Sequence, residues 1–273
     1  MKRMSPWNNS RNHQIWQQSQ QQQESLLIGF MIAGDPSPTE SLQIIDQAFV
    51  AGLDIIELGI PSQHPKLDGE IIQRGHARVL ETQPDMEWIV DYCSRLRKQV
   101  DQPIWVMGYR EDLYQTGLYQ ILAKQGLLDA LLIPDCSLTE QKELDKALAP
   151  YEVDVARFVD HSLSDDEMRE ICQNASLIYA QSYPGKTGRM NVDPHDLSKL
   201  YQRISEQTTT AFQMVGFGIG SPEKVKIAVE IGFQGVVVGS ALVAQIEQRA
   251  YHSLYRLISE MKKETKNRKE KGE

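Results

Sequence analysis

The chain has 273 residues, of which 41% are hydrophobic and 24% are charged, and its formal net charge is −8. This acidic balance argues against general nucleic-acid binding, which needs a basic surface, and no apolar run is long enough to cross a bilayer. The length exceeds that of most single domains, but an α/β barrel reaches this size as one domain.

Three cysteines, Cys93, Cys136 and Cys172, are odd in number and widely spaced. They indicate neither a disulfide framework nor a zinc site, and no cluster of His, Cys and carboxylate residues has the spacing of metal ligands. We therefore expect a cytoplasmic protein without a metal site.

Residues 1–25 form a polar, Gln-rich leader that lacks the apolar central region of a signal peptide. We expect this leader to be disordered or loosely helical. At the other end, residues 262–273 read as a charged tail, the frayed end of the last helix.

Between these ends, from 26 to 261, short apolar runs alternate with longer helical patterns. The runs are LLIGFMI (26–32), DIIELGI (54–60), PIWVMGY (103–109), DALLIPD (129–135), DVARFVD (154–160), LIYAQSY (177–183), FQMVGFG (212–218) and GVVVGSA (235–241). Near-continuous apolar strands indicate burial on both faces, as in a parallel sheet.

The segments between the runs have helical apolar spacing, and two of them, TESLQIIDQAFVAG and SPEKVKIAVEIG, open near Ser or Thr and end at Gly. Eight such units predict a single (β/α)8 TIM barrel. An open doubly wound sheet is the main rival, but AGDPSP follows the first strand where that fold expects a Gly-rich dinucleotide turn.

Chemistry in a barrel collects at the C-terminal ends of the strands. Glu57 is the one charged residue inside the apolar second strand, and Asp68 lies in the loop after it. Tyr109 ends the third strand, Asp135 ends the fourth, and Tyr179 lies in the sixth.

The stretch SYPGKTGR (182–189) contains Gly-Lys-Thr, the end of a nucleotide-binding P-loop. The full motif also needs a glycine at position 180, where this chain has Ala180. The incomplete motif argues against a nucleotide site, and the role of the segment depends on where it lies in the fold.

The run DIIELGIPSQHPKLDGEIIQ, together with AGDP, IPD, GKTG, GFGI and VVVGSA, resembles the α chain of tryptophan synthase over residues 26–260. The resemblance implies a (β/α)8 barrel that splits indole-3-glycerol phosphate into indole and glyceraldehyde 3-phosphate without metal or organic cofactor. It also implies a possible partner, the pyridoxal-phosphate-dependent β chain.

The same resemblance implies roles for individual residues. Glu57 stands where the family has its catalytic acid/base, and Asp68 where the family has the aspartate that binds the indole N–H. Tyr179 matches the active-site tyrosine of strand six, and Thr187 matches the lid threonine that meets that aspartate on closure. The positions matched to phosphate or substrate binding are Tyr109, Gly188, Phe217, Gly218, Gly239 and Ser240.

Physical chemistry supports the two main elements of this site. A glutamate flanked by Ile56 and Leu58 is desolvated, which disfavours its carboxylate; raising its pKa from about 4.3 to near 7 costs roughly 3–4 kcal/mol. The alternative is a structural Glu57 paired with a Lys or Tyr. Glycines that end strands seven and eight before a helix start are typical of phosphate sites in barrels, although they could also only make tight turns.

The loop after strand two departs from the family between Ser62 and Lys66, because His64 replaces an aspartate and Ser62 a phenylalanine. This alters the surface that couples to the β chain. His64 is either an exposed loop histidine or a proton shuttle beside Asp68.

Three functions remain open at this point. The first is the lyase, as a synthase subunit or as a stand-alone producer of indole. The second is a weakly catalytic or non-catalytic phosphate-binding subunit that modulates a β partner. The third is a retro-aldolase for a related aryl polyol phosphate. Retention of Glu57, Asp68, Tyr179 and Thr187 together favours the lyase.

Overall fold

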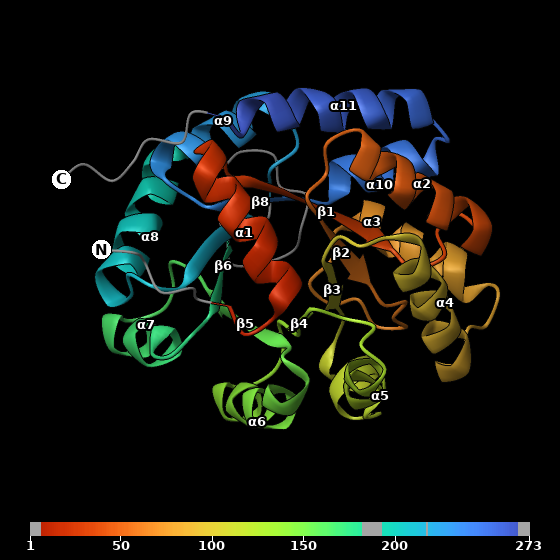
Figure 1. Ribbon diagram of the computed structural model, residues 1–273, viewed down its shortest axis with the longest axis horizontal. Coiled ribbons are helices and arrows are strands. Elements are labelled where there is room, and N and C mark those ends of the chain that lie inside the picture. Colours follow the sequence, from red (N-terminus) through yellow and green to blue (C-terminus); the bar gives the residue numbers. More distant parts are fainter. Residues whose placement is uncertain (1–6, 182–192, 217, 267–273) are drawn as a thin grey trace.

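The computed structural model describes residues 7–181, 193–216 and 218–266. These residues form eight parallel strands that close into a barrel in sequence order (Figure 1). The strands are β1 Leu26–Ile32, β2 Ile55–Gly59, β3 Ile104–Met107, β4 Ala130–Leu132, β5 Asp154–Val159, β6 Leu177–Gln181, β7 Phe212–Gly216 and β8 Gly235–Val238. Every strand lies within its predicted run, so the single (β/α)8 TIM barrel is confirmed.

Helices connect and surround the strands (Figure 1). They are α1 Ser10–Gln22, α2 Pro38–Val50, α3 Glu70–Leu80, α4 Met86–Gln99, η1 Arg110–Tyr114, α5 Leu118–Lys124, α6 Leu138–Leu148, η2 Ala149–Tyr151, α7 Asp165–Cys172, α8 Pro194–Gln207, α9 Pro222–Ile231, α10 Ser240–Glu247 and α11 Tyr251–Glu264. Local sequence explains where several helices begin. Ser137 and Ser164 form capping boxes at the starts of α6 and α7. At the start of α2, the Ser37 side chain accepts a hydrogen bond from Glu40 N, and Pro38 is the first helical residue.

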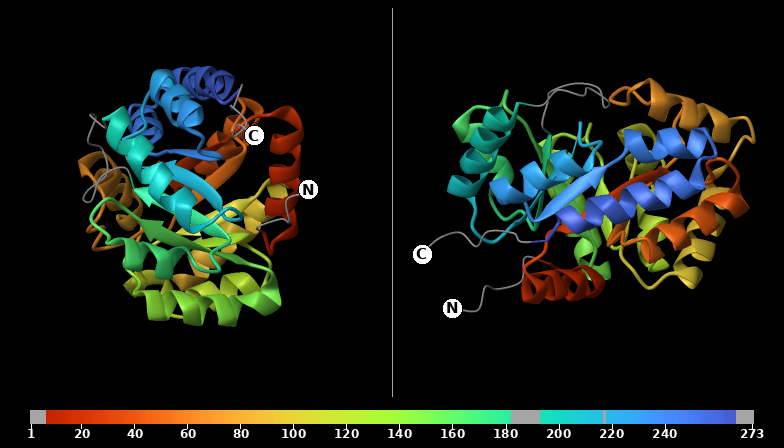
Figure 2. Two further views of the ribbon diagram at one scale, coloured as in Figure 1. Left: turned by 90° about the vertical axis from the view of Figure 1, so that its left-hand side faces the viewer. Right: turned by 90° about the horizontal axis from the view of Figure 1, so that it is seen from above.

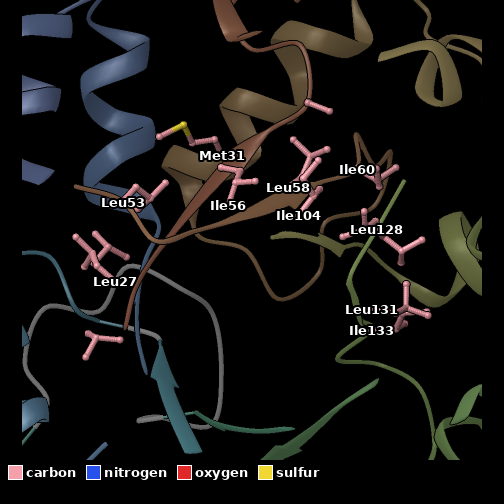
Figure 3. Close-up of a cluster of buried hydrophobic side chains, with 14 of the residues drawn as sticks. Leu27, Met31, Leu53, Ile56, Leu58, Ile60, Ile104, Leu128, Leu131 and Ile133 are labelled. Atoms are coloured by element: carbon pink, nitrogen blue, oxygen red, sulfur yellow. The ribbon is translucent and has the colours of Figure 1, made fainter. Parts of the chain in front are cut away.

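The apolar residues separate into two layers because alternate strand residues face opposite sides of the sheet. One set fills the barrel interior and includes Ile28, Ile55, Trp105 and Phe212. The other set packs between the strands and the outer helices. Figure 3 shows part of it, with Leu27, Met31, Ile56, Leu58 and Ile104 among its members.

Of the two expectations for the leader, disorder is wrong over Ser10–Gln22 and a helix is right, since these residues form α1. This helix lies across one end of the barrel (Figure 2), and its Trp16 side chain joins the interior cluster. The Asn12 amide donates to Asp154 Oδ2 at 2.9 Å and accepts from Trp105 Nε1 at 2.8 Å. The Gln-rich composition hid these contacts because only a few buried residues anchor an otherwise exposed helix.

The predicted boundary at residue 261 also falls too early, because α11 continues to Glu264 and Thr265 is fully buried. Lys262 Nζ pairs with Asp54 at 2.8 Å and with Glu24 at 3.2 Å. The first residues of the predicted tail therefore belong to the barrel.

Candidate active site

Glu57 points into the barrel from the middle of β2. It shares a strand face with Ile55, which belongs to the interior cluster, and its register neighbours are Phe30 on β1 and Trp105 on β3. The residue is 1% exposed, and neither carboxylate oxygen has a hydrogen-bond partner among the described residues. Burial, followed by the like charge of Asp68, raises the pKa of Glu57 to about 8.

These observations remove the structural alternative for Glu57, since no Lys or Tyr of the described chain is hydrogen-bonded to it. Buried polar groups are normally paired, so an unpaired carboxyl group at the functional end of a barrel indicates a chemical role. A group with this pKa is mostly protonated at neutral pH and can both deliver and accept a proton.

Asp68 lies beyond β2 in the loop before α3 and is 8% exposed. Its Oδ2 accepts a hydrogen bond from the Tyr109 hydroxyl at 2.7 Å, and that hydroxyl accepts from Leu67 N at 3.1 Å. Burial, followed by the charge of Asp68, raises the pKa of Tyr109, so the phenol stays a donor. The structure therefore brings together two predicted site residues from different loops.

Tyr179 faces the interior from β6 and is 3% exposed. Its ring stacks on Phe158 with the centroids 5.1 Å apart. Burial raises the pKa of Tyr179 well above its ordinary value, and the charges of Glu57 and then Asp68 act in the same direction. The three residues predicted as catalytic therefore share one electrostatic environment.

The sequence analysis missed Gly216, which makes room for Tyr179. A Cβ atom at this position would collide with the tyrosine hydroxyl. Any larger residue at the end of β7 would therefore displace the Tyr179 ring. The only signal in the sequence was a glycine inside the predicted seventh strand, next to the glycine-rich turn that follows it.

The loops after β7 and β8 meet at the expected phosphate site. Gly239 precedes α10, which begins at Ser240, and a Cβ atom on Gly220 would lie 3.7 Å from Cβ of Ala241. Gly218 has a φ of 93°, a conformation that favours glycine, and its carbonyl accepts from Lys224 Nζ at 2.8 Å. Backbone N–H groups at such a helix start suit an anion.

Three predicted site residues, Thr187, Gly188 and Phe217, lie outside the described residues. Asp135 is described but serves the backbone, because its Oδ1 accepts from Arg110 N at 2.8 Å. His64 pairs with Glu111 at 3.0 Å on the surface, with its side chain 68% exposed. The reading of His64 as an exposed loop histidine therefore agrees with the structure.

A different histidine lies beside Asp68. His76 on α3 is 2% exposed, and its Nε2 lies 3.4 Å from Asp68 Oδ2. Its Nδ1 accepts from Ser62 N at 3.2 Å. A small cavity adjoins Asp68, and its lining comprises Phe30, Gly59, Ile60, Asp68, His76, Met107, Gly108, Tyr109 and Pro134.

A closed barrel with an unpaired glutamic acid, an oriented aspartate and glycine loops suited to phosphate defines a barrel enzyme that works by acid–base chemistry on a phosphorylated substrate. Among the described residues, no three His, Cys, Asp or Glu side chains form a group that could hold a metal ion. No helix in the described part of the chain has the length and apolarity needed to cross a membrane.

Comparison with known proteins narrows this class. The family described as "Tryptophan synthase alpha chain" matches residues 16–271. The tryptophan synthase alpha chain of Carboxydothermus hydrogenoformans is 33% identical over 241 residues, which cover 87% of this chain and 90% of the relative. That of Alkaliphilus metalliredigens is 34% identical over 227 residues, which cover 82% and 84%.

A solved structure agrees in fold. Tryptophan synthase subunit alpha from Legionella pneumophila has a TM-score of 0.82 at 24% identity, with 94% of this chain and 98% of that chain covered. The chain therefore belongs to the tryptophan synthase alpha chain family. It is a lyase of tryptophan biosynthesis that cleaves indole-3-glycerol phosphate to indole and glyceraldehyde 3-phosphate.

Proposed function

We propose that Glu57 is the acid/base of this cleavage, assisted by Asp68 and Tyr179. The observation that carries the proposal is the buried Glu57 carboxyl group, which has no hydrogen-bond partner in the described chain and a pKa raised to about 8. Such a group exists as the neutral acid near pH 7, in a site where its proton can be given and regained.

Retro-aldol cleavage needs one proton added and one removed. The bond between indole C3 and the side chain breaks, C3 receives a proton, and the side-chain hydroxyl loses its proton as the aldehyde forms. In our proposal the protonated Glu57 supplies the first proton, and its carboxylate then takes the second, so the group returns to its starting state. No redox or group-transfer partner is needed for this balance.

Asp68 is proposed to hold the indole N–H. Its Oδ2 already accepts from Tyr109, and Oδ1 of the same carboxylate is the acceptor that we assign to the substrate. The charge of Asp68 also contributes to raising the pKa of Glu57, although burial is the larger cause. A hydrogen-bonded indole nitrogen gains electron density, which favours protonation at C3.

The phosphate group is proposed to bind at the start of α10 and the loop after β7. The described residues assigned to it are Gly218, Gly239 and Ser240, whose backbone amides lie at the adjoining ends of β7 and β8. Thr187, Gly188 and Phe217 complete the proposed set of substrate-binding residues.

We also propose a tryptophan synthase β chain as a partner, with altered coupling. The residues between Ser62 and Lys66 form the loop expected to communicate with it, and His64 there is engaged with Glu111. A cytoplasmic location is proposed as well, because Cys93, Cys136 and Cys172 are all free and buried.

The proposal is tested by measuring indole release from indole-3-glycerol phosphate, by the purified chain alone and with a tryptophan synthase β chain added. Turnover that rises with the β chain indicates a coupled subunit, and turnover that does not rise indicates a stand-alone lyase. Full turnover by a Glu57→Gln variant would contradict the assignment of the acid/base. An intact chain that releases no indole in either assay would contradict the substrate.

A further inference from the structure

His76 stands between the Ser62 backbone N–H and the Asp68 carboxylate, two groups of the loop after β2. It projects from α3, eight residues after Asp68, and its ring lines both the small cavity beside Asp68 and an outer groove formed by residues 62–66 and one face of α3. The ring is 2% exposed. A histidine enclosed in this way meets Asp68 through Nε2, which lies 3.4 Å from Oδ2, so it can act on the reaction through that carboxylate.

The hydrogen bond to Ser62 identifies which ring nitrogen carries the proton. The Ser62 backbone N–H donates to Nδ1 at 3.2 Å, so Nδ1 is an acceptor and bears no proton. The ring proton is then on Nε2, the atom that lies 3.4 Å from Asp68 Oδ2. At this position Nε2 is within ion-pair distance, although its orientation does not meet hydrogen-bond geometry. Contacts of this kind commonly tighten when a substrate binds.

Hydrogen bonds of its hydroxyl group hold Ser62 in place. The loop therefore keeps the Ser62 N–H in position to donate to Nδ1 of His76. The Ser62 hydroxyl accepts from His64 N at 3.2 Å and hydrogen-bonds the side chain of Asp112 on η1. A continuous chain of contacts therefore runs from Asp112 through Ser62 and His76 to Asp68. It passes through Ser62, in the loop that departs from the family, and ends at the carboxylate proposed to bind the indole N–H.

We infer that His76 is a positioning residue: held by the Ser62 N–H with Nε2 3.4 Å from Asp68 Oδ2, it completes a hydrogen bond to that oxygen when substrate binds and, with Tyr109, leaves Oδ1 turned toward the substrate. This inference rests on the role proposed for Asp68. Two donors on one oxygen restrict rotation of the carboxylate, as partners of an active group commonly do. A loop with Ser62 and a helix with His76 then form one supporting unit.

The decisive experiment compares His76→Gln, which keeps a donor near the Nε2 position, with His76→Leu, which keeps bulk and removes it. We expect His76→Leu to lower kcat for indole release about tenfold, because misplacement of a positioned group has effects of this size or larger. His76→Gln is expected to recover most of that loss. Equal loss in both variants would reduce His76 to a packing residue and overturn the inference.

Two further variants separate this inference from the role of Asp68. In an Asp68→Asn background, His76→Leu is expected to have little additional effect, since both changes act through the same carboxylate. Full turnover by Asp68→Asn alone would remove the proposed role of Asp68 and the inference with it. A slow Asp68→Asn with His76→Leu at the wild-type rate would overturn the inference alone. Val79→Ala, a buried change one turn along α3, controls for loosened packing and should leave kcat within about twofold.

A spectroscopic measurement on the unmodified protein keeps the inference testable even where a variant folds poorly. In 15N-labelled protein, the ring nitrogen shifts of His76, assigned by comparison with His76→Gln, are expected to report Nε2–H with an unprotonated Nδ1. A ring protonated on Nδ1 would be incompatible with the Ser62 contact and would overturn the assignment.

Discussion

Two buried carboxyl groups of the barrel, Asp154 and Glu57, have opposite surroundings. At the end covered by α1, the Asp154 carboxylate accepts from Asn12 Nδ2 and from the backbone N–H groups of Asn8 and Asn9 at 2.9–3.3 Å. At the other end, Glu57 has no hydrogen-bond partner within the described chain. Burial raises the pKa of both carboxyl groups, but only at Asp154 do hydrogen bonds oppose it.

This difference separates stability from chemistry within one fold. Paired groups at the α1 end hold a helix onto the barrel and add to the free energy of unfolding. The unpaired glutamic acid lowers that free energy and is the group that we propose as the proton donor near neutral pH. Substitutions at the α1 end should therefore change the free energy of unfolding, whereas substitutions at Glu57 should change turnover.

The largest effect is expected for turnover at Glu57. Glu57→Gln keeps the size of the side chain and removes its proton, so indole release should fall about 10³-fold, within the usual range for a general acid/base. Glu24→Gln is the matched change at the α1 end, where Glu24 pairs with Lys262 at 3.2 Å, and it should leave kcat unaltered. Comparable losses in both variants would erase the functional distinction between the two ends.

The same substitution should raise stability in a pH-dependent way. Between pH 4.5 and about 8 the unfolded chain has lost the Glu57 proton while the folded chain keeps it, so the free energy of unfolding of the wild type falls as pH rises. Glu57→Gln lacks this decline. Relative to pH 4.5, its advantage at pH 8 should reach about 3–5 kcal/mol.

Urea unfolding of wild type and Glu57→Gln at several pH values measures this advantage, because other titrating groups cancel in the difference. The gap should stop growing above the pKa of about 8. A difference that stays constant from pH 4.5 to 8 would mean that Glu57 ionises normally in the folded chain.

At the α1 end, Asn12→Leu should act on stability alone. The change removes the acceptor of Trp105 Nε1 and a donor to Asp154, so the free energy of unfolding should fall by about 3 kcal/mol. Turnover at 25 °C should stay within about twofold while the chain is folded. Gln18→Ala on the exposed face of α1 serves as the control. A large loss of kcat without a loss of stability would couple α1 to catalysis.

The smallest effect is expected at Tyr109, which supports the active site without taking a proton. Tyr109→Phe removes the donor to Asp68 Oδ2 and should lower kcat about three- to tenfold, which corresponds to the net contribution of one ordinary hydrogen bond. Tyr119→Phe, another buried tyrosine, whose hydroxyl accepts from Gln120 Nε2 at 2.9 Å, should have no such effect. Indole release under saturating substrate measures both, and equal rates for the two variants would argue against an oriented Asp68.

The barrel itself could be predicted from sequence because each strand is a short, nearly continuous apolar run between helical patterns. Burial on both faces of a parallel sheet requires this composition, and β1 coincides with the predicted run at both ends. Glu57 stood out for the same reason, as one charge inside an apolar strand. Asp68 and Tyr179 were selected by their places in the predicted barrel, their roles came from the resemblance, and those roles stay predictions.

Other features depend on contacts between distant segments, so local patterns do not predict them. The sequence of α1 is polar and Gln-rich, and its place in the fold depends on Trp16 and Asn12 meeting a barrel end assembled from β3, β4 and β5. The role of Gly216 likewise depends on the Tyr179 ring from the neighbouring strand.

The barrel and the burial of Glu57 followed from local sequence, because periodicity and an isolated charge are properties of short segments, whereas the class of chemistry followed from the resemblance of several motifs to one family. Only the tertiary structure decided that Glu57 has no partner in the described chain and that His76, rather than His64, lies beside Asp68. Both outcomes depend on which side chains converge when the strands close. The pKa of a buried group follows from that convergence, since it depends on every neighbouring charge and hydrogen bond.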